Sequence, residues 1–185
     1  DLLRAHLRRD VFVVHRLDRD TSGLLVFAKS LRVERALEAQ WSTHERVYEA
    51  LVDGVVARDA GTIESRMITT KNLDRRSTRA HERGGEVAIT HYRVIARMRD
   101  ATLLEVKLET GRRNQIRVHL AEMRHPILGD ARYARTSRPH ARWRGGLALH
   151  ARKLAFAHPT TRAQLAFDAG RRADFSAFVD ENKSR

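Results

Sequence analysis

The sequence HRLDRDTSG at residues 15–23 gathers the side chains best suited to chemistry. This polar segment stands directly before an apolar run at residues 24–28 that is typical of a buried strand. Loops at strand ends often carry catalytic groups, because the strands behind them are rigid. Asp18 is therefore a candidate nucleophile or base, although the residues from Asp20 to Gly23 are also the types found in an ordinary turn. Spacing alone leaves both interpretations open.

Tyr48 and Arg117 are further candidates, and each has a structural alternative. Tyr48 falls in an apolar stretch at residues 47–52, and an aromatic side chain on such a strand face usually belongs to the core. Arg113 and Arg117 stand four residues apart with Arg124 seven further on, so this helical stripe could simply contact phosphate. The planar, permanently charged guanidinium of Arg117 is equally suited to pairing with a carboxylate.

The composition favours a polyanionic partner. The formal net charge is +13 and the pI is near 11.2, and a basic surface attracts phosphate at long range and gains from counterion release. Nucleic acid is the leading partner, with an anionic membrane surface second. Of the 36 basic residues 31 are Arg, however, and codon usage could produce the same bias.

Several absences exclude other classes of protein. Without cysteine there can be no disulfide, thiol nucleophile or Cys-ligated zinc site. His119 and His125 are six residues apart, which does not match the spacing of a helical zinc pair. We expect neither metal nor cofactor. No apolar run reaches the ~20 residues of a membrane span, and the charged first ten residues do not resemble a signal peptide. We expect a monomeric, cytoplasmic protein without membrane contact.

The apolar patterns predict helices interspersed with hairpins. The expected elements are a helix at 30–41 capped by Ser30, strands at 47–52, 87–97 and 102–109, a helix after Gly111, a hairpin of 147–156 with 164–167, and a final helix capped by Asp174. Residues 66–85 are charged, end in two glycines and are expected to form a loop. Together the elements predict an α+β fold, with a mixed, mainly antiparallel β-sheet and flanking helices, in one domain of residues 1–185.

Four segments, in order, resemble those of the RluA-type pseudouridine synthases. They are HRLDRDTSG at 15–23, RVYEALVDG at 46–54, TGRRNQIRVHL at 110–120 and LHARKLAFAHP at 149–159. The resemblance implies the pseudouridine synthase catalytic fold and an enzyme that isomerises uridine to pseudouridine in RNA. Large-subunit ribosomal RNA is the expected substrate. A transfer RNA substrate, or a catalytically inactive RNA-binding domain of the same fold, is the alternative.

The resemblance also assigns catalytic roles to three residues. Asp18 matches the family's catalytic aspartate, Tyr48 its active-site tyrosine and Arg117 its conserved arginine. We expect Arg117 to lie within ion-pair distance of Asp18 and to lower its pKa by ~1–3 units, against the rise that burial causes. Tyr48 would stack on a uracil extracted from the RNA helix, since the reacting atoms are inaccessible in a stacked duplex.

Basic residues around these motifs are the candidate RNA contacts. Residues 112–144 contain nine Arg against two acidic residues, and together with residues 66–83 they form the expected track of the RNA backbone. The named candidates are Arg16, Arg19, Arg112, Arg113, Arg124 and Arg132. Arg16 is also suited to filling the space that the extracted base leaves. A merely solvated basic surface is the alternative.

The sequence departs from the family pattern in several places. No Lys-Pro strand precedes the HRLD segment and the chain does not begin with Met, so we interpret the N-terminal edge of the fold as truncated, without the small RNA-binding module of many relatives. Asn114 stands where the family commonly has His, and Ala134 follows Tyr133 where Gly is common. A glycoside hydrolase is a third hypothesis, but such enzymes usually need two carboxyl groups, and only Asp20 lies near Asp18.

Overall fold

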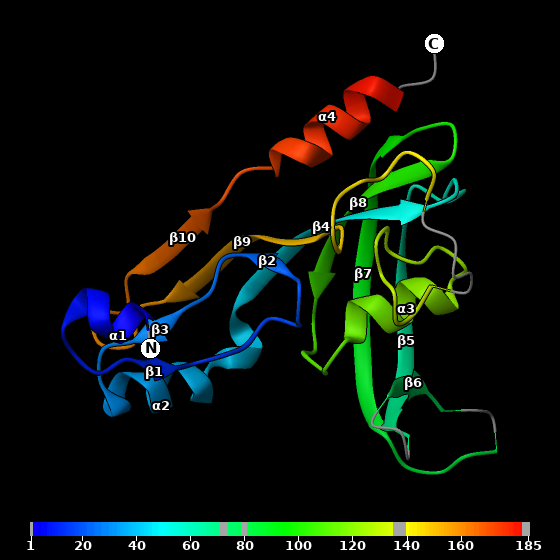
Figure 1. The fold of residues 1–185 in the computed structure, drawn as a ribbon. Helices are drawn as coiled ribbons and strands as arrows, with labels where there is room; N and C mark the ends of the chain where they lie inside the picture. The colour runs from blue at the N-terminus through cyan, green and yellow to red at the C-terminus, as the bar shows by residue number, and fades with distance from the viewer. Residues whose placement is uncertain (1, 71–73, 79–80, 135–139, 183–185) are drawn as a thin grey trace.

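The computed structural model of the chain describes residues 2–70, 74–78, 81–134 and 140–182. Its largest element is an eight-stranded sheet in the order β10-β9-β4-β8-β7-β5-β6, with β2 beside β9 (Figure 1). The strands of this sheet are β2 (Ser22–Gly23), β4 (Glu45–Asp53), β5 (Ala60–Thr69), β6 (Arg75–Ser77), β7 (Glu86–Arg97), β8 (Ala101–Leu108), β9 (Leu149–Ala157) and β10 (Gln164–Asp168), while β1 (Phe12–Val13) and β3 (Phe27–Ala28) pair separately. All neighbours in that order are antiparallel, whereas β2 runs parallel to β9.

The helices are short and lie around the sheet. They are α1 (Leu2–Leu7), α2 (Leu31–Ala39), the 3₁₀ turn η1 (Trp41–Thr43), α3 (Gln115–Glu122) and α4 (Ala173–Asn182). In Figure 1, α1 and α2 lie with β1 and β3 at one end of the molecule, and α3 lies beside β5 and β7. None of the helices in the described part of the chain is both long and apolar enough to cross a membrane. The α+β fold with a mainly antiparallel sheet and flanking helices is confirmed.

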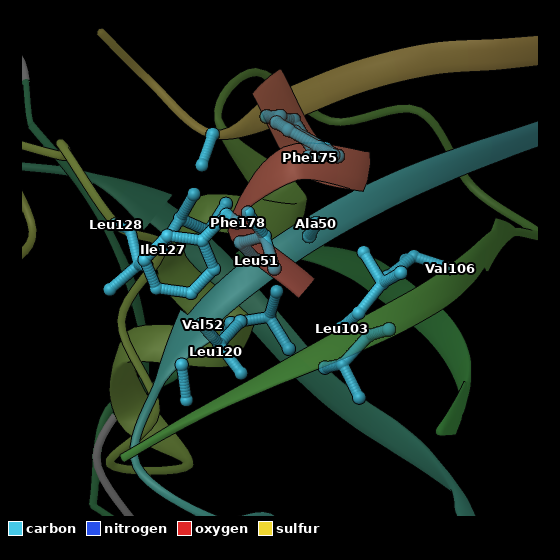
Figure 2. Packing of buried hydrophobic residues seen from close by; sticks show 14 of the residues in the cluster. Ala50, Leu51, Val52, Leu103, Val106, Leu120, Ile127, Leu128, Phe175 and Phe178 are labelled. Atoms are coloured by element: carbon cyan, nitrogen blue, oxygen red, sulfur yellow. The ribbon is translucent and has the colours of Figure 1, made fainter. Parts of the chain in front are cut away.

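The largest core joins β4 and β8 to α3 and α4. Figure 2 shows the side chains that meet there, among them Leu51 and Val52 of β4, Leu103 and Val106 of β8, Leu120 of α3, and Phe175 and Phe178 of α4. Ala50, Leu51 and Val52 are all 0% exposed. Because successive strand residues point to opposite faces, both faces of β4 are covered at this point. Tyr48 precedes these residues on the same strand and therefore has a rigid support.

A second core holds the N-terminal segment against β9. The hydroxyl of Ser30 accepts a hydrogen bond from the N–H of Val33 (3.3 Å) and caps α2 as predicted. Leu37 of α2 is buried with Leu154 and Phe156 of β9. The segment at residues 15–23 thus lies between two packed parts of the fold.

The T-S-G end of that segment joins it to the sheet through β2. Gly23 pairs with Ala151 of β9, and its φ of +113° lies in the region that favours glycine. A Cβ at this position would lie 2.2 Å from the carbonyl oxygen of Ala151. Ser22 Oγ and His150 Nδ1, 2.9 Å apart, form a hydrogen bond beside this contact. A glycine is therefore required where the segment meets β9.

The prediction of one strand at residues 24–28 was wrong. Only Phe27 and Ala28 belong to a strand. The N–H of Leu24 donates to the carbonyl of Ala151 (2.9 Å), and the N–H of Val26 donates to Nε2 of His15 (3.0 Å). The backbone N–H groups of this apolar run therefore bond to separate partners instead of pairing along one neighbouring strand.

The prediction of a loop at residues 66–85 was also partly wrong, because the end of β5 and all of β6 lie within it. Along β5 partly exposed residues alternate with exposed ones and only Met67 is buried, so its apolar alternation is weak. At the C-terminus the final helix is confirmed, but Asp174 lies in its first turn and pairs with Arg172. The hairpins β7-β8 and β9-β10 lie where the sequence predicted them.

Candidate active site

A pocket opens where the segment at residues 15–23 meets β4 and the start of α3. Arg16 and Asp18 line it from the first segment, Tyr48 from β4, and Arg112 from the turn before α3. Sequence reasoning selected all four residues, and the fold brings them together from three distant stretches of chain.

Asp18 lies in a turn closed by a hydrogen bond from the N–H of Thr21 to its carbonyl oxygen (3.0 Å). Its Oδ1 accepts a hydrogen bond from the backbone N–H of Asn114 (3.2 Å). Burial raises the pKa of the Asp18 carboxyl above its usual value, and the Asn114 N–H and the charges of Arg117 and Arg16 only partly oppose this rise. The pocket thus disfavours the charge on this carboxylate more than water does.

Arg117 does not form the ion pair with Asp18 that the sequence predicted. Its guanidinium pairs with Asp130 through two hydrogen bonds of 2.8 Å, from Nε to Oδ2 and from Nη2 to Oδ1. Within the described residues no ion pair of Arg117 other than this one is found. The planar fork of the guanidinium matches a carboxylate in this geometry, and Asp130 is available because it follows α3 closely in the chain. Arg117 acts on Asp18 only at longer range.

Asn114 links Asp18 to Arg117, which in turn pairs with Asp130. Its backbone is left-handed, with φ of 57°, and this conformation turns its N–H toward Asp18. Its side-chain oxygen accepts a hydrogen bond from Nη1 of Arg117 (3.2 Å), and its amide nitrogen donates to the hydroxyl of Tyr133 (3.0 Å). Asn tolerates the left-handed conformation better than most residues. The backbone conformation at position 114 therefore favours asparagine over most other residues.

Asp130 anchors this arrangement in the interior. Its side chain is 0% exposed, and its Oδ1 also accepts hydrogen bonds from the N–H groups of Arg132 (2.9 Å) and Tyr133 (3.0 Å). Burial alone would raise the pKa of Asp130, but the hydrogen bonds from Arg117 and from the Tyr133 N–H outweigh it and the pKa is lowered. The carboxylate stays charged and holds Arg117 in place.

Tyr48 is a neutral phenol in this pocket. Burial raises its pKa from 10.0 to about 12, the charge of Arg46 opposes the rise, and the charge of Asp18 adds to it. Near neutral pH the hydroxyl therefore keeps its proton and can donate a hydrogen bond, while the ring offers an aromatic face.

The other predicted RNA contacts are spread over the surface. Arg112 pairs with Glu86 (2.9 Å) as well as lining the pocket, and Arg132 pairs with Asp74. Arg19 and Arg113 are exposed. Residues 71–73, 79–80 and 135–139, which belong to the predicted RNA track, lie outside the described residues.

Arg124 lines a second groove beside α3. Arg75 and Arg76 of β6 and Tyr133 share this groove. It lies on the part of the surface where the sequence predicted the RNA backbone track. Among the described residues, no cluster of three or more His, Asp or Glu side chains is placed to hold a metal ion.

Sequence reasoning missed Arg46, Asn114 and Asp130 as parts of the site. Arg46 lines the pocket beside Tyr48, and its position two residues before Tyr48 on one strand was an available signal. Asn114 was noted only as a departure from the family pattern. Nothing in the spacing identified Asp130 as the partner of Arg117.

Comparison with known proteins relates this geometry to one family. The sequence profile described as RNA pseudouridylate synthase matches residues 1–122. Ribosomal large subunit pseudouridine synthase D of Zymomonas mobilis is 38% identical over 164 residues, which cover 85% of this chain and 51% of that protein. The uncharacterized RNA pseudouridine synthase YlyB of Bacillus subtilis is 39% identical over 170 residues, covering 91% of this chain and 54% of that protein. The chain spans about half the length of these curated relatives.

The fold is also similar to that of a solved human protein. Human RNA Pseudouridylate Synthase Domain Containing 1 superposes with a TM-score of 0.78 at 22% sequence identity, over 91% of this chain and 72% of that one. At this identity the likeness shows the fold.

Proposed function

Because the chain belongs to the RNA pseudouridylate synthase family and is of the RluA type, we propose that it isomerises specific uridines to pseudouridine in large-subunit ribosomal RNA. The names of its relatives from Zymomonas mobilis and Pasteurella multocida support this substrate, since both are called ribosomal large subunit pseudouridine synthase D. The net charge of +13 suits a polyanionic substrate.

The observation that carries the proposal is the convergence of Asp18 and Tyr48 in one pocket. The two residues come from separate motifs, and each is held by a rigid part of the fold. A carboxylate and an aromatic phenol side by side provide a nucleophile for the ribose and a stacking surface for a base. A pocket built only for phosphate would not need a partly buried carboxylate, because its charge would repel the ligand.

Asp18 is the proposed nucleophile. Its carboxylate attacks C1′ of the target uridine, the N1–C1′ bond breaks, and the bonding electron pair leaves with the uracil. The uracil turns so that C5 attacks C1′ and displaces the carboxylate. The proton lost from C5 and the proton gained at N1 balance the product. The raised pKa of Asp18 makes its ionised form a stronger nucleophile than a solvated aspartate.

Tyr48 is the proposed support for the base. Its ring can stack on the extracted uracil, and its protonated hydroxyl can donate a hydrogen bond while the uracil carries negative charge. A pKa of about 12 makes it a poor base near neutral pH. Tyr48 therefore acts through stacking and hydrogen bonding, and removal of the C5 proton requires another group or water.

Base extraction is part of the same proposal, because the reacting atoms cannot be reached in a stacked duplex. Arg16 is the residue proposed to occupy the space that the base leaves, and its exposed position in the lining of the pocket supports this role. Arg19, Arg112, Arg113, Arg124 and Arg132 are the proposed contacts to the RNA backbone on either side.

The test compares wild type with Asp18→Asn and with a matched control, Asp20→Asn. The substrate is ribosomal RNA transcribed in vitro, which contains no pseudouridine at the start. We expect Asp18→Asn to lose at least ~10⁴-fold in rate, as removal of a nucleophile does in other enzymes. Asp20 is exposed with φ of 68°, and Asn suits that backbone. The control should keep wild-type activity.

Each other outcome selects an alternative. Activity in Asp18→Asn would contradict the nucleophile assignment. Activity only on transfer RNA transcripts would favour a transfer RNA substrate. RNA binding without pseudouridine formation by wild type on either RNA would favour an inactive RNA-binding domain.

A further inference from the structure

Arg46 is a buried cation that faces the same pocket. It stands two residues before Tyr48 on β4 and lines the pocket with it. The residue is only 6% exposed, and burial lowers the pKa of its guanidinium. Arginine is almost never this buried unless an opposite charge accompanies it.

Arg46 lacks such a partner among the described residues, where no carboxylate forms an ion pair with it. Its protein contacts are long hydrogen bonds from Nη2 to the carbonyl oxygens of Leu108 (3.5 Å) and Glu109 (3.4 Å). Its Nε is buried and has no hydrogen-bond partner. Most of the charge and donor capacity of this guanidinium is therefore unused within the described part of the chain.

The guanidinium is nevertheless held in place. The Trp41 ring lies 5.7 Å from its central carbon, which is within cation–π range. On another side, a Cβ added to Gly111 would lie 2.6 Å from Nη1, so the backbone of the turn before α3 approaches closely. A side chain fixed in this way loses little entropy when it binds a ligand.

A second polar atom of the pocket is also unused. Thr21 lines the pocket, and its hydroxyl oxygen is buried without a hydrogen-bond partner in the described ranges of the chain. Buried polar atoms without partners destabilise the folded state. Together with the uncompensated charge of Arg46, these two atoms indicate that a polar, anionic group completes the pocket.

We propose that Arg46 binds a phosphate group of the RNA nucleotide that enters this pocket, an inference that rests on the proposed function. Phosphate is the fully ionised group of RNA, and its oxygens match the planar fork of a guanidinium. The carbonyl groups of uracil are neutral and would leave the buried charge uncompensated. Arg46 thus contributes to substrate affinity and to the placement of the ribose next to Asp18.

The test is a double-mutant cycle between Arg46 and the RNA backbone. The RNA is a short oligonucleotide with one target uridine, and the phosphate on its 5′ or its 3′ side is replaced by an uncharged methylphosphonate. Binding is measured by fluorescence anisotropy in the Asp18→Asn background, so that no turnover occurs. The compared proteins carry Arg46, Arg46→Gln, Arg46→Lys or the control Arg58→Gln, which removes an exposed arginine.

We expect Arg46→Gln to weaken binding of the unmodified RNA about 10- to 100-fold. One of the two methylphosphonates should weaken binding to the Arg46 protein by a similar factor and have no further effect on Arg46→Gln. Arg46→Lys should recover part of the affinity, because it restores the charge without the fork. Arg58→Gln should have a small effect that is the same for every backbone.

Additive effects at both phosphates would overturn the inference, because Arg46 would then contact the base or the protein instead. Thermal unfolding of Arg46→Gln is measured alongside, so that a loss of folding is distinguished from a loss of binding. If wild type forms no pseudouridine, the proposed function fails while the binding cycle still reports on the phosphate contact. If pseudouridine forms and the cycle is additive, only the Arg46 inference fails.

Discussion

The two arginines on either side of the pocket differ in how their charge is compensated. On the α3 side, Arg117 is neutralised by Asp130 and also donates a hydrogen bond to Asn114. On the β4 side, Arg46 has no ion-pair partner in the described part of the chain, and Nε has no hydrogen bond. The comparison suggests a division of work. The α3 side is a completed scaffold that fixes the backbone N–H facing Asp18, whereas the β4 side keeps its charge for a ligand.

Neighbouring histidines follow the same division. His119 of α3 is 0% exposed and hydrogen-bonds through both ring nitrogens, with Ser65 (2.9 Å) and Thr90 (2.8 Å). His44, which precedes β4, is 4% exposed, and neither of its ring nitrogens has a hydrogen-bond partner among the residues that the structure describes. The α3 side is therefore expected to contribute more to stability, and the β4 side more to binding.

The largest predicted effect is that of Asp130→Asn. The substitution keeps the shape of the side chain but leaves the buried Arg117 without a counter-charge, which should cost about 3–5 kcal/mol in free energy of unfolding. Urea denaturation measures this loss. The matched control is Asp59→Asn, since Asp59 is 89% exposed in its pair with Arg97 and such surface pairs contribute about 0–1 kcal/mol. Equal losses in the two variants would contradict the assignment of the α3 side as scaffold.

The second prediction concerns pH and His119. Burial lowers its pKa from 6.5 to about 4, so the unfolded chain takes up the proton first as the pH falls. Stability from this group is complete above pH 6.5 and is lost progressively as the pH falls through 4, by up to ~3 kcal/mol. Urea denaturation at several pH values measures the slope, which should be shallower in His119→Gln. An unchanged slope would show that the buried ring takes up a proton as easily as in water.

The smallest predicted effect is that of Asn114→Gly, which tests the joint between the scaffold and Asp18. Glycine keeps the left-handed backbone and the N–H that faces Asp18, but it removes the hydrogen bonds to Arg117 and Tyr133. For Asn114→Gly we expect a loss of about 1–2 kcal/mol in free energy of unfolding and a lower turnover rate. Asn114→Ala should lower the turnover rate further, because alanine adds backbone strain in the left-handed conformation. Thermal unfolding and single-turnover rates measure both effects. If alanine is tolerated as well as glycine, the left-handed conformation is not what positions the N–H.

Much of the fold could be predicted because local signals agreed with tertiary packing. Ser30 and the four-residue spacing of Val33, Leu37 and Trp41 indicated α2, and all three apolar residues belong to the second core. The strand β5 could not be predicted in the same way. Its side chains are partly exposed along most of its length, and its pairing with β7 is set by backbone hydrogen bonds that leave no pattern in the sequence.

The sequence predicted some residues of the candidate site but not how they pair. The motifs identified Asp18, Tyr48 and Arg117. The partner of Arg117, however, depends on which carboxylate the segment after α3 brings next to it. That carboxylate is Asp130, which lies outside the four motifs. Arg46 was missed for a different reason, although its position two residues before Tyr48 was an available signal. The protein is rich in basic residues, and only the structure shows that this one is buried and that its Nε has no partner among the described residues.

The close contact between Gly23 and Ala151 means that the geometry of the site depends on the absence of a side chain at position 23. Any larger residue at position 23 would push β2 away from β9 and carry Asp18, five residues earlier, out of register with the Asn114 N–H. A displacement of about 1 Å is enough to cost ~10²-fold in rate for an oriented nucleophile. Such a variant would keep every reactive group and still be slow. The proposed chemistry therefore depends on glycine at position 23 as much as on the carboxylate of Asp18.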